Sequence, residues 1–338
     1  MNPSKLLFSA TLMLGTLMSV SSTSWLSSWM GLEINLLSFI PLMINTKNTL
    51  STEAALKYFL IQALASSIFL FTVILMHLND MTLLLNQPLF LTLISSSLLL
   101  KMGAAPFHFW FPGTMEGLSW MNCLILMTWQ KIAPFMLISY VITMNTFISM
   151  VVISSILIGS LGGLNQTSLR KVMAYSSITH SGWMLAALTT GENYWLLYFS
   201  IYTFLSSSIV TLFQSFQLYH INQNFLIKLP SSEKFWLFFL LLSLGGIPPF
   251  MGFMPKWFII QSLANLDHLP LLTAMVITTL LTLFYYLRMA FTAFSLSSQE
   301  VSWFEILLKP NLSHLILMML STISTVGLPL CTLMFTML

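Results

Sequence analysis

The chain has 338 residues, of which 57% are hydrophobic and only 6% are charged. A soluble domain carries about 25% charged residues, so this composition excludes a soluble globular protein and indicates a membrane protein. The net charge is only +3, and the sequence contains no cluster of Lys and Arg. It therefore gives no sign of nucleic-acid binding, which needs basic patches to meet the phosphates.

The sequence offers no evident site for a metal or a nucleotide cofactor. Its two cysteines, Cys123 and Cys331, lie far apart in apolar stretches. An iron–sulfur cluster or a structural zinc ion needs about four ligands. The glycine pairs Gly162-Gly163 and Gly245-Gly246 do not belong to a nucleotide-binding loop. We therefore expect no cofactor and no metal in this chain.

Apolar runs of about 20 residues recur along the whole chain, and each is long enough to cross a hydrocarbon layer of roughly 30 Å. We predict an all-α, polytopic bundle of eleven transmembrane helices in a single domain, residues 1–338. The predicted spans are 4–22, 25–44, 55–78, 83–111, 118–141, 145–164, 171–189, 193–219, 234–260, 270–294 and 313–336.

The loop charges predict how these spans are oriented. Alternating loops place eight basic residues on the side of the amino terminus and none on the opposite side. These eight are Lys5, Lys47, Lys57, Arg170, Lys171, Lys228, Lys234 and Lys309. Because basic loops stay on the inner side of a membrane, we expect the amino terminus in the matrix or cytoplasm. An odd number of spans then puts the carboxyl terminus on the other side.

Three lysines and one glutamate fall within the predicted spans: Lys101, Lys131, Lys256 and Glu33. A charge at the bilayer centre costs about 2.5–3.5 kcal/mol, so these side chains are expected to face the bundle interior or water. Static ion pairing is the structural alternative. Glu33 could pair with one lysine only, and we see no second carboxylate within the spans.

Buried lysines next to a carboxylate are suited to proton transfer. Burial disfavours the charged form of an amine, whereas a nearby carboxylate favours it, so small rearrangements let the amine take up or release a proton. His108 and His180 could extend the pathway, because histidine titrates near neutral pH. Each histidine could equally be a polar residue bonded to a neighbouring helix.

Two spans contain helix-breaking sequences close to a lysine, at Gly103 to Pro106 and at Gly245 to Pro249. Proline removes a backbone donor, and freed backbone groups in a membrane must be satisfied by protein or water. The breaks lie five spans apart, which predicts inverted repeats over roughly 1–141 and 145–294, followed by the helix 313–336. Packing kinks, and a snorkelling side chain at Lys256, are the alternatives.

Four segments carry a resemblance to a known family: Trp29 to Asn35, Lys101 to His108, Thr128 to Pro134 and Gly245 to Pro249. They resemble the chain 2 family of animal mitochondrial NADH–ubiquinone oxidoreductase, respiratory complex I. This resemblance implies an antiporter-like membrane subunit related to Mrp-type cation/proton antiporters. It also implies a hydrophilic axis that passes through Glu33, Lys101, Lys131 and Lys256 in that order.

The resemblance implies a place and a set of partners as well. It predicts a multi-pass protein of the mitochondrial inner membrane, with its amino terminus in the matrix and its carboxyl terminus in the intermembrane space. The expected partners are other complex I membrane subunits, including further antiporter-like ones, and membrane lipids. FMN, iron–sulfur clusters and ubiquinone are expected in partner subunits and not in this chain.

We therefore predict a subunit that moves protons from the matrix to the intermembrane space, coupled to electron transfer from NADH to ubiquinone elsewhere in the enzyme. Moving one charge against the membrane potential costs about 2.3 kcal/mol per 100 mV, so the energy must come from a partner. Two alternatives stay open: a stand-alone cation/proton antiporter, and a structural membrane subunit whose charges only brace its neighbours.

Overall fold

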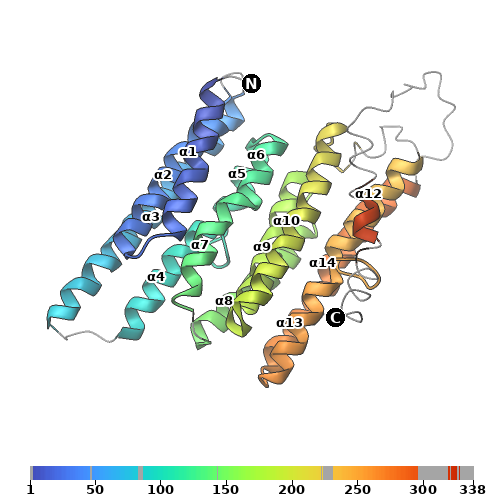
Figure 1. The fold of residues 1–338 in the computed structure, drawn as a ribbon. Helices are drawn as coiled ribbons and strands as arrows, with labels where there is room; N and C mark the ends of the chain where they lie inside the picture. The colour runs from blue at the N-terminus through green and yellow to red at the C-terminus, as the bar shows by residue number, and fades with distance from the viewer. Residues whose placement is uncertain are drawn as a thin grey trace. The chain divides into compact units, whose positions relative to one another are not determined.

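The structure is a computed structural model that describes residues 3–45, 48–82, 87–142, 144–221, 223, 231–295, 319, 321–325 and 327. The described part is helical apart from turns and one isolated antiparallel bridge between Ser168 and His220 (Figure 1). This confirms the predicted all-α class. The predicted span 313–336 lies mostly outside the described residues.

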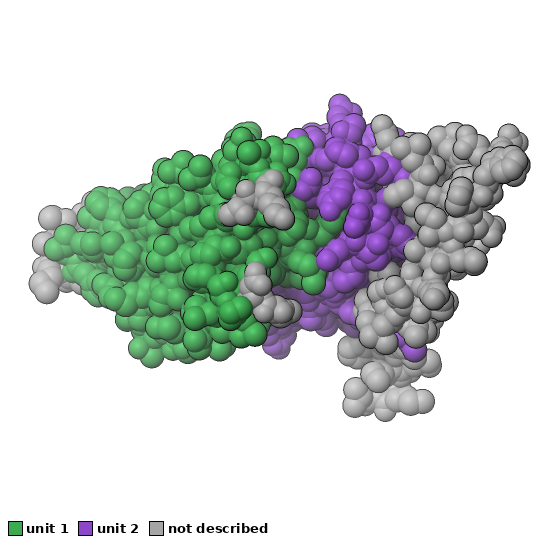
Figure 2. Space-filling model, turned by 90° about the horizontal axis from the view of Figure 1, so that it is seen from above, with its two compact units in different colours: residues 1–155 green, residues 156–338 purple. Residues whose placement is uncertain are grey.

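The chain divides into two compact units, Met1–Ser155 and Ile156–Leu338, which are coloured separately in Figure 2. The boundary between them falls inside the helix α8 (Thr146–Gly163). Our predicted repeats were divided earlier in the chain, between residues 141 and 145. That division into repeats stays a prediction.

The first unit is a bundle of helices that precede α8. These are α1 (Pro3–Val20), α2 (Trp25–Met43), α3 (Thr49–Thr82), α4 (Gln87–Met102), α5 (Trp110–Gly117), α6 (Trp120–Met127) and α7 (Trp129–Ser139). Helix α3 packs against α2, α4 and α5, while α7 packs against α1 and α4. The helices that carry Glu33, Lys101 and Lys131 therefore belong to one packed bundle.

The second unit contains the end of α8 and the helices that follow it. These are α9 (Leu169–Thr190), α10 (Glu192–Ser215), α12 (Ser231–Gly245), α13 (Phe253–Asn265) and α14 (Leu269–Ser295). Helix α9 packs against α10 and α13, and α10 also contacts α12. Helix α14 packs against both α12 and α13.

Helix α9 is unusual because it is polar and yet lies deep inside its unit. Of its 22 residues, 17 are buried, which is the pattern of a central helix surrounded by others. Four hydroxyl side chains of α9 donate to backbone carbonyl groups three residues earlier, which satisfies them without water. They belong to Ser176, Ser177, Thr179 and Ser181.

Among the residues that the structure describes, seven helical segments are long and apolar enough to cross a membrane. The apolar helices α4 and α12 are shorter, because each of them ends at one of the predicted breaks. A multi-pass membrane fold is therefore confirmed, whereas the number of eleven spans stays a prediction.

Two predicted spans differ from the structure. The span 83–111 ends too early, because α5 continues the chain as helix as far as Gly117. The span 118–141 corresponds to the apolar segment Trp120–Ser139, but this segment is not a single helix, because Thr128 separates α6 from α7 with φ −113° and ψ −71°. The Thr128 hydroxyl donates to the carbonyl of Leu124 at 2.7 Å, a contact that bends helices. Pro134 within α7 further removes a backbone donor.

Candidate functional site

The first break closes α4 with a Schellman motif, the usual glycine-terminated helix end. The backbone N–H of Gly103 donates to Leu100 at 3.2 Å, and that of Ala104 donates to Leu99 at 3.2 Å. Gly103 has φ +71°, a left-handed conformation that side-chain-bearing residues rarely adopt. The helix resumes at Trp110, seven residues after this glycine.

The second break repeats this construction in the other unit. The N–H of Gly246 donates to Ser243 at 3.0 Å, and that of Ile247 donates to Leu242 at 3.5 Å. Gly246 has φ +77°, and the next helix begins at Phe253, again seven residues later. Both predicted interruptions are therefore confirmed, and the two units share one local design.

Lys101 lies in the last turn of α4, immediately before the first break, and its side chain is buried. Two backbone carbonyls at the end of α4 also accept hydrogen bonds from side chains. Gln62 Nε2 donates to the Lys101 carbonyl at 3.2 Å, and Trp110 Nε1 donates to the Leu100 carbonyl at 3.1 Å. The interruption thus survives in apolar surroundings because protein groups replace the lost helical bonds.

Glu33 lies on α2, is half-buried, and interacts electrostatically with Lys101 and with Tyr58. Its Oε1 atom is buried and makes no hydrogen bond with the described residues. Buried carboxylate oxygens are normally hydrogen-bonded, either to protein or to ordered water. Glu33 is therefore within electrostatic range of Lys101, and its Oε1 atom is an acceptor that a water molecule could satisfy.

Lys131 is the third residue of α7, one turn after the discontinuity at Thr128, and only 2% of it is exposed. Its ammonium lies 5.3 Å from the ring centroid of Phe111 on α5, within the range of a cation–π interaction. All three predicted lysines therefore sit beside a discontinuity in a helix. The sequence had indicated only the two glycine-containing breaks.

A hydrogen-bonded chain that the sequence did not reveal lies beside these charges. Tyr58 Oη donates to Gln130 Oε1 at 3.3 Å, and Gln130 Nε2 donates to Asn35 Oδ1 at 2.8 Å. The chain connects α3, α7 and α2. Because Gln130 is adjacent to Lys131 in the sequence and Asn35 lies two residues from Glu33, it ties the helices that carry both charges.

His108 lies within the first break, where it is buried. Its Nδ1 atom is 3.3 Å from the carbonyl of Pro106. Its place in a proton pathway stays a prediction. Nearby, Glu116 is half-buried on α5. This residue falls between the predicted spans 83–111 and 118–141, because their bounds leave out most of α5.

Lys256 belongs to α13, but its side chain reaches back across the second break. Its buried ammonium donates to the carbonyl of Gly245 at 2.7 Å and lies 5.9 Å from the ring centroid of Trp183 on α9. A snorkelling lysine would instead extend along the outside of the helix towards the headgroups. The structure thus places this ammonium in the interior, at the end of α12.

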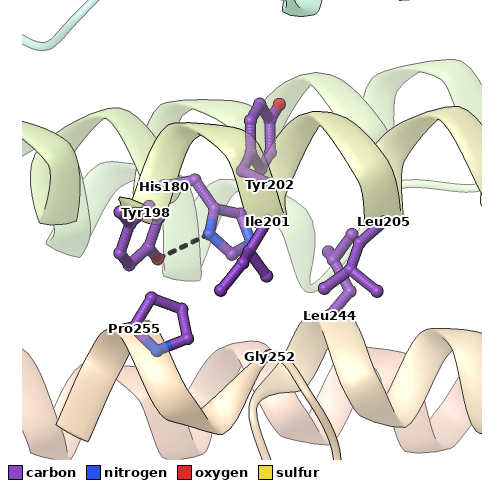
Figure 3. A pocket seen from close by; sticks show the side chains of 8 residues that line it. All are labelled: His180, Tyr198, Ile201, Tyr202, Leu205, Leu244, Gly252 and Pro255. Carbon is purple, nitrogen blue, oxygen red and sulfur yellow. Dashed lines mark hydrogen bonds between the residues drawn. The ribbon is translucent and has the colours of Figure 1, made fainter. Parts of the chain in front are cut away.

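His180 is buried on α9, and its Nδ1 atom is 2.8 Å from the hydroxyl oxygen of Tyr198 on α10. It lines a small cavity of about 10 Å³, room for about one water molecule. Figure 3 shows this cavity between α10 and the second break. Its lining is His180, Tyr198, Ile201, Tyr202, Leu205, Leu244, Gly252 and Pro255.

In the part of the chain that the structure describes, no group of three or more His, Cys, Asp or Glu side chains could hold a metal ion. Cys123 is buried, and its Sγ atom lies 3.4 Å from the carbonyl oxygen of Met115.

Comparison with known proteins places the chain in a family. Residues 22–282 match the transmembrane family described as NADH:quinone oxidoreductase/Mrp antiporter. The chain is 55% identical to NADH-ubiquinone oxidoreductase chain 2 of Anopheles gambiae, over 91% of this chain and 90% of that protein. The corresponding protein of Aedes aegypti is 52% identical, with 97% of each chain covered. That of the shark Squalus acanthias is 42% identical, with 99% of each covered.

Solved structures share this fold. A chain of respiratory complex I from Thermus thermophilus superposes with a TM-score of 0.84 and 25% identity, covering 96% of this chain and 78% of that one. A chain of the Mrp complex from Dietzia has the same fold, with a TM-score of 0.72 and 18% identity over 82% of this chain and 58% of its own. The chain therefore belongs to the NADH:quinone oxidoreductase/Mrp antiporter family and, within it, to the NADH-ubiquinone oxidoreductase chain 2 subunits.

Proposed function

We propose that the chain is a proton-translocating membrane subunit of respiratory complex I in the mitochondrial inner membrane. Glu33, Lys101, Lys131 and Lys256 carry the proton pathway in this proposal, and His108 and His180 extend it. Electron transfer from NADH to ubiquinone takes place in other subunits, which hold the FMN and the iron–sulfur clusters. This chain contributes charges that can be moved within the membrane.

One observation carries the proposal: each of the three buried lysines lies beside a helix discontinuity. A continuous helix holds its side chains at a fixed depth, whereas an interrupted one leaves polar backbone groups that attract water and permit local movement. A buried amine beside such an interruption can take up a proton from water in one step of transport. It can then pass that proton to another group in the next step.

The interaction between Glu33 and Lys101 supplies the switch. The charged form of Lys101 is favoured while the carboxylate is close, and it is disfavoured when a second ammonium approaches. Lys131 belongs to α7, which packs against the helix of Lys101. A proton delivered to Lys131 therefore weakens the hold of Lys101 on its own proton, which can then pass on.

We further propose that the amino terminus lies in the matrix and the carboxyl terminus in the intermembrane space, as the loop charges indicate. Other complex I membrane subunits, including antiporter-like ones, are the neighbours in the plane of the membrane. Relatives that match this chain along nearly its whole length are named as oxidoreductase subunits. This supports an assembly partner over a stand-alone antiporter.

Substitution of Lys131 by methionine tests the function in the assembled enzyme. We expect Lys131→Met to preserve assembly, because methionine fills the same buried volume without a charge, and to lower proton pumping for each NADH oxidised. Lys57→Met is the matched control, since Lys57 is exposed on α3. Native gel electrophoresis measures assembly, and the pH change in sealed inner-membrane vesicles measures pumping.

The alternatives predict different results. A structural brace would lose assembly in Lys131→Met, while the complex that still forms would pump normally. A stand-alone antiporter would exchange sodium for protons when the purified chain is placed alone in liposomes. Normal pumping in fully assembled Lys131→Met complex would remove this lysine from the mechanism.

A further inference from the structure

Four buried tyrosines gather around α9 in the second unit, and the pathway proposed above does not use them. Tyr198 and Tyr202 belong to α10, whereas Tyr285 and Tyr286 belong to α14. At most 3% of any of the four is exposed. The rings of Tyr285 and Tyr286 are 4.6 Å apart, and Tyr286 is in electrostatic range of both tyrosines on α10.

The hydroxyl groups of the two tyrosines on α14 lack well-formed hydrogen bonds. The hydroxyl oxygens of Tyr285 and Tyr286 are buried, and neither makes a hydrogen bond of good geometry with the described residues. Burying a phenol hydroxyl without a partner is unfavourable, and phenylalanine would pack equally well without this cost. Two such hydroxyls in one cluster indicate that they act as donors and acceptors in another state or through water.

Acceptors for these hydroxyls stand on α9. Ser176 lies beside Tyr286, and Thr179 lies beside Tyr285. The Ser176 hydroxyl already gives its proton to the carbonyl of Met173 at 2.7 Å, and the Thr179 hydroxyl gives its own to the carbonyl of Ser176 at 2.7 Å. Both oxygens can therefore accept a hydrogen bond from a tyrosine or a water, and each can pass a proton on once its own hydroxyl turns away from the carbonyl.

The cluster leads directly to His180. In Figure 3 the hydroxyl of Tyr198 points at the imidazole, and its oxygen forms the 2.8 Å hydrogen bond with Nδ1. Tyr202 packs its ring 5.0 Å from the imidazole, and its hydroxyl points away from the cavity. His180 thus contacts two of the four tyrosines, and it lines the water-sized cavity together with them.

The cavity extends from His180 to the residue that precedes Lys256. Pro255, which precedes Lys256, lines the cavity together with His180. Trp183, one turn after His180 on α9, lies 5.9 Å from the Lys256 ammonium. One water in the cavity would therefore stand between the imidazole and the backbone of the second break.

We infer that Tyr198, Tyr202, Tyr285 and Tyr286, with the hydroxyls of Ser176 and Thr179, form a proton relay that feeds His180. The relay runs along α9 from the end that carries Arg170 and Lys171. Ser176 lies four residues before His180, about 6 Å along the helix axis. This inference rests on the proposed function, and it names the groups that deliver protons to the second unit.

Each step of the relay breaks one O–H bond and forms another. When Tyr198 gives its hydroxyl proton to Nδ1 of His180, it receives a proton at the same time from the neighbouring hydroxyl or water, so no phenolate accumulates. The imidazolium then releases its other N–H proton into the cavity, towards the second break. The net result is one proton moved, with the imidazole left protonated at Nδ1, so both the imidazole and the hydroxyls must reorient before the next proton passes.

Replacement of tyrosine by phenylalanine tests the relay, because it removes the hydroxyl and keeps the ring. We expect Tyr198→Phe and Tyr286→Phe to reduce proton pumping per NADH severalfold in sealed vesicles, while the amount of assembled complex stays unchanged. Tyr194→Phe is the matched control, because Tyr194 also lies on α10 but is 39% exposed. Replacing H₂O by D₂O should slow pumping in the wild-type complex more than in the two variants.

A packing role predicts the opposite pattern. Tyr286→Phe would then be neutral or more heat-stable with normal pumping, because an unsatisfied hydroxyl has been removed, and the relay would be refuted. If Lys131→Met pumps fewer protons while both tyrosine variants pump normally, the relay is refuted and the proposed function is retained. If Lys131→Met also pumps normally, both the relay and the proposed function are refuted.

If the tyrosine variants do not assemble, the relay can be tested with smaller substitutions at serines on α9. Ser176→Ala removes one relay oxygen with little change in volume, and Ser181→Ala, also on α9, is its control. Slower pumping in Ser176→Ala alone would support the relay. Equal pumping in the two serine variants would overturn it.

Discussion

The ammonium of Lys256 donates a hydrogen bond of 2.7 Å to the carbonyl oxygen of Gly245, the residue at which α12 ends. The carboxyl end of a helix carries a partial negative charge, so it stabilises a cation placed there. Lys256, on α13, therefore caps the carboxyl end of α12 across the break. Movement at the break and the charge on Lys256 are consequently coupled.

Gly246 tests this coupling from the backbone side. A Cβ atom at Gly246 would lie 2.8 Å from the Lys256 ammonium, in a residue with φ +77°. We expect Gly246→Ala to cost about 1–3 kcal/mol of local stability and to displace the ammonium. Proton pumping in sealed vesicles should fall. Gly245→Ala is the neighbouring control, because its Cβ would meet only ordinary contacts at 3.5 Å. Equal pumping in the two variants would contradict the coupling.

Lys256 itself is tested by methionine. Lys256→Met keeps the length of the side chain but leaves the Gly245 carbonyl without its donor, which costs about 1–3 kcal/mol. We expect the complex to assemble and to bind ubiquinone, while coupled turnover decreases because a proton-carrying group is lost. Ubiquinone reduction and pumping are measured on the same vesicles. Normal pumping by the assembled variant would show that Lys256 has only a structural role.

Glu33 is expected to matter for pumping more than for assembly. Glu33→Gln removes the negative charge that favours the protonated form of Lys101, and it keeps the shape of the side chain. We expect a lower yield of pumped protons per NADH with an unchanged amount of complex on a native gel. Glu53→Gln is the control, because Glu53 is exposed on α3. An unchanged proton yield in Glu33→Gln would exclude Glu33 from the switch.

Parts of this arrangement could be predicted from sequence for clear physical reasons. Charges in apolar spans are conspicuous, so Lys101, Lys131 and Lys256 could be recognised without a structure. Glycine next to proline is a strong helix-breaking signal, and both breaks were located to within a few residues. These features depend on local chemistry alone.

Other parts depend on packing between distant segments. The hydrogen bonds of Gln130 join residues 72 and 95 positions away in the chain, and nothing in the local sequence marks those partners. The bend at Thr128 contains no glycine, so the sequence does not predict it. No sequence pattern sets the tyrosines around α9 apart, because aromatic residues are frequent throughout the chain.

The orientation in the membrane can be tested independently of the mechanism. Eight basic loop residues on one side and none on the other predict that the carboxyl terminus faces the intermembrane space. A short epitope tag after Leu338 should be cleaved by protease added to mitoplasts, in which the outer membrane is open. A tag that is protected until the inner membrane is also disrupted would reverse the assignment.

The chain of Tyr58, Gln130 and Asn35 offers a final test of the charge balance near Lys131. The substitution Gln130→Glu preserves the shape of the side chain and still lets Tyr58 donate its hydrogen bond, while the amide of Asn35 can turn to donate in place of accepting. The change therefore adds one buried negative charge with little effect on packing. This charge stands next to Lys131 in the sequence and near Tyr58, which already interacts with Glu33.

A second carboxylate at this place should hold the ammonium of Lys131 in its charged form, because opposite charges in a poorly solvated interior attract strongly. We expect Gln130→Glu to assemble normally and to pump more slowly than the wild type. Gln130→Met serves as its control, since it removes the hydrogen bonds without adding a charge and should mainly reduce heat stability. If Gln130→Met slows pumping as much as Gln130→Glu, the hydrogen-bonded chain matters for holding α2, α3 and α7 together, and the added charge has no separate effect on Lys131.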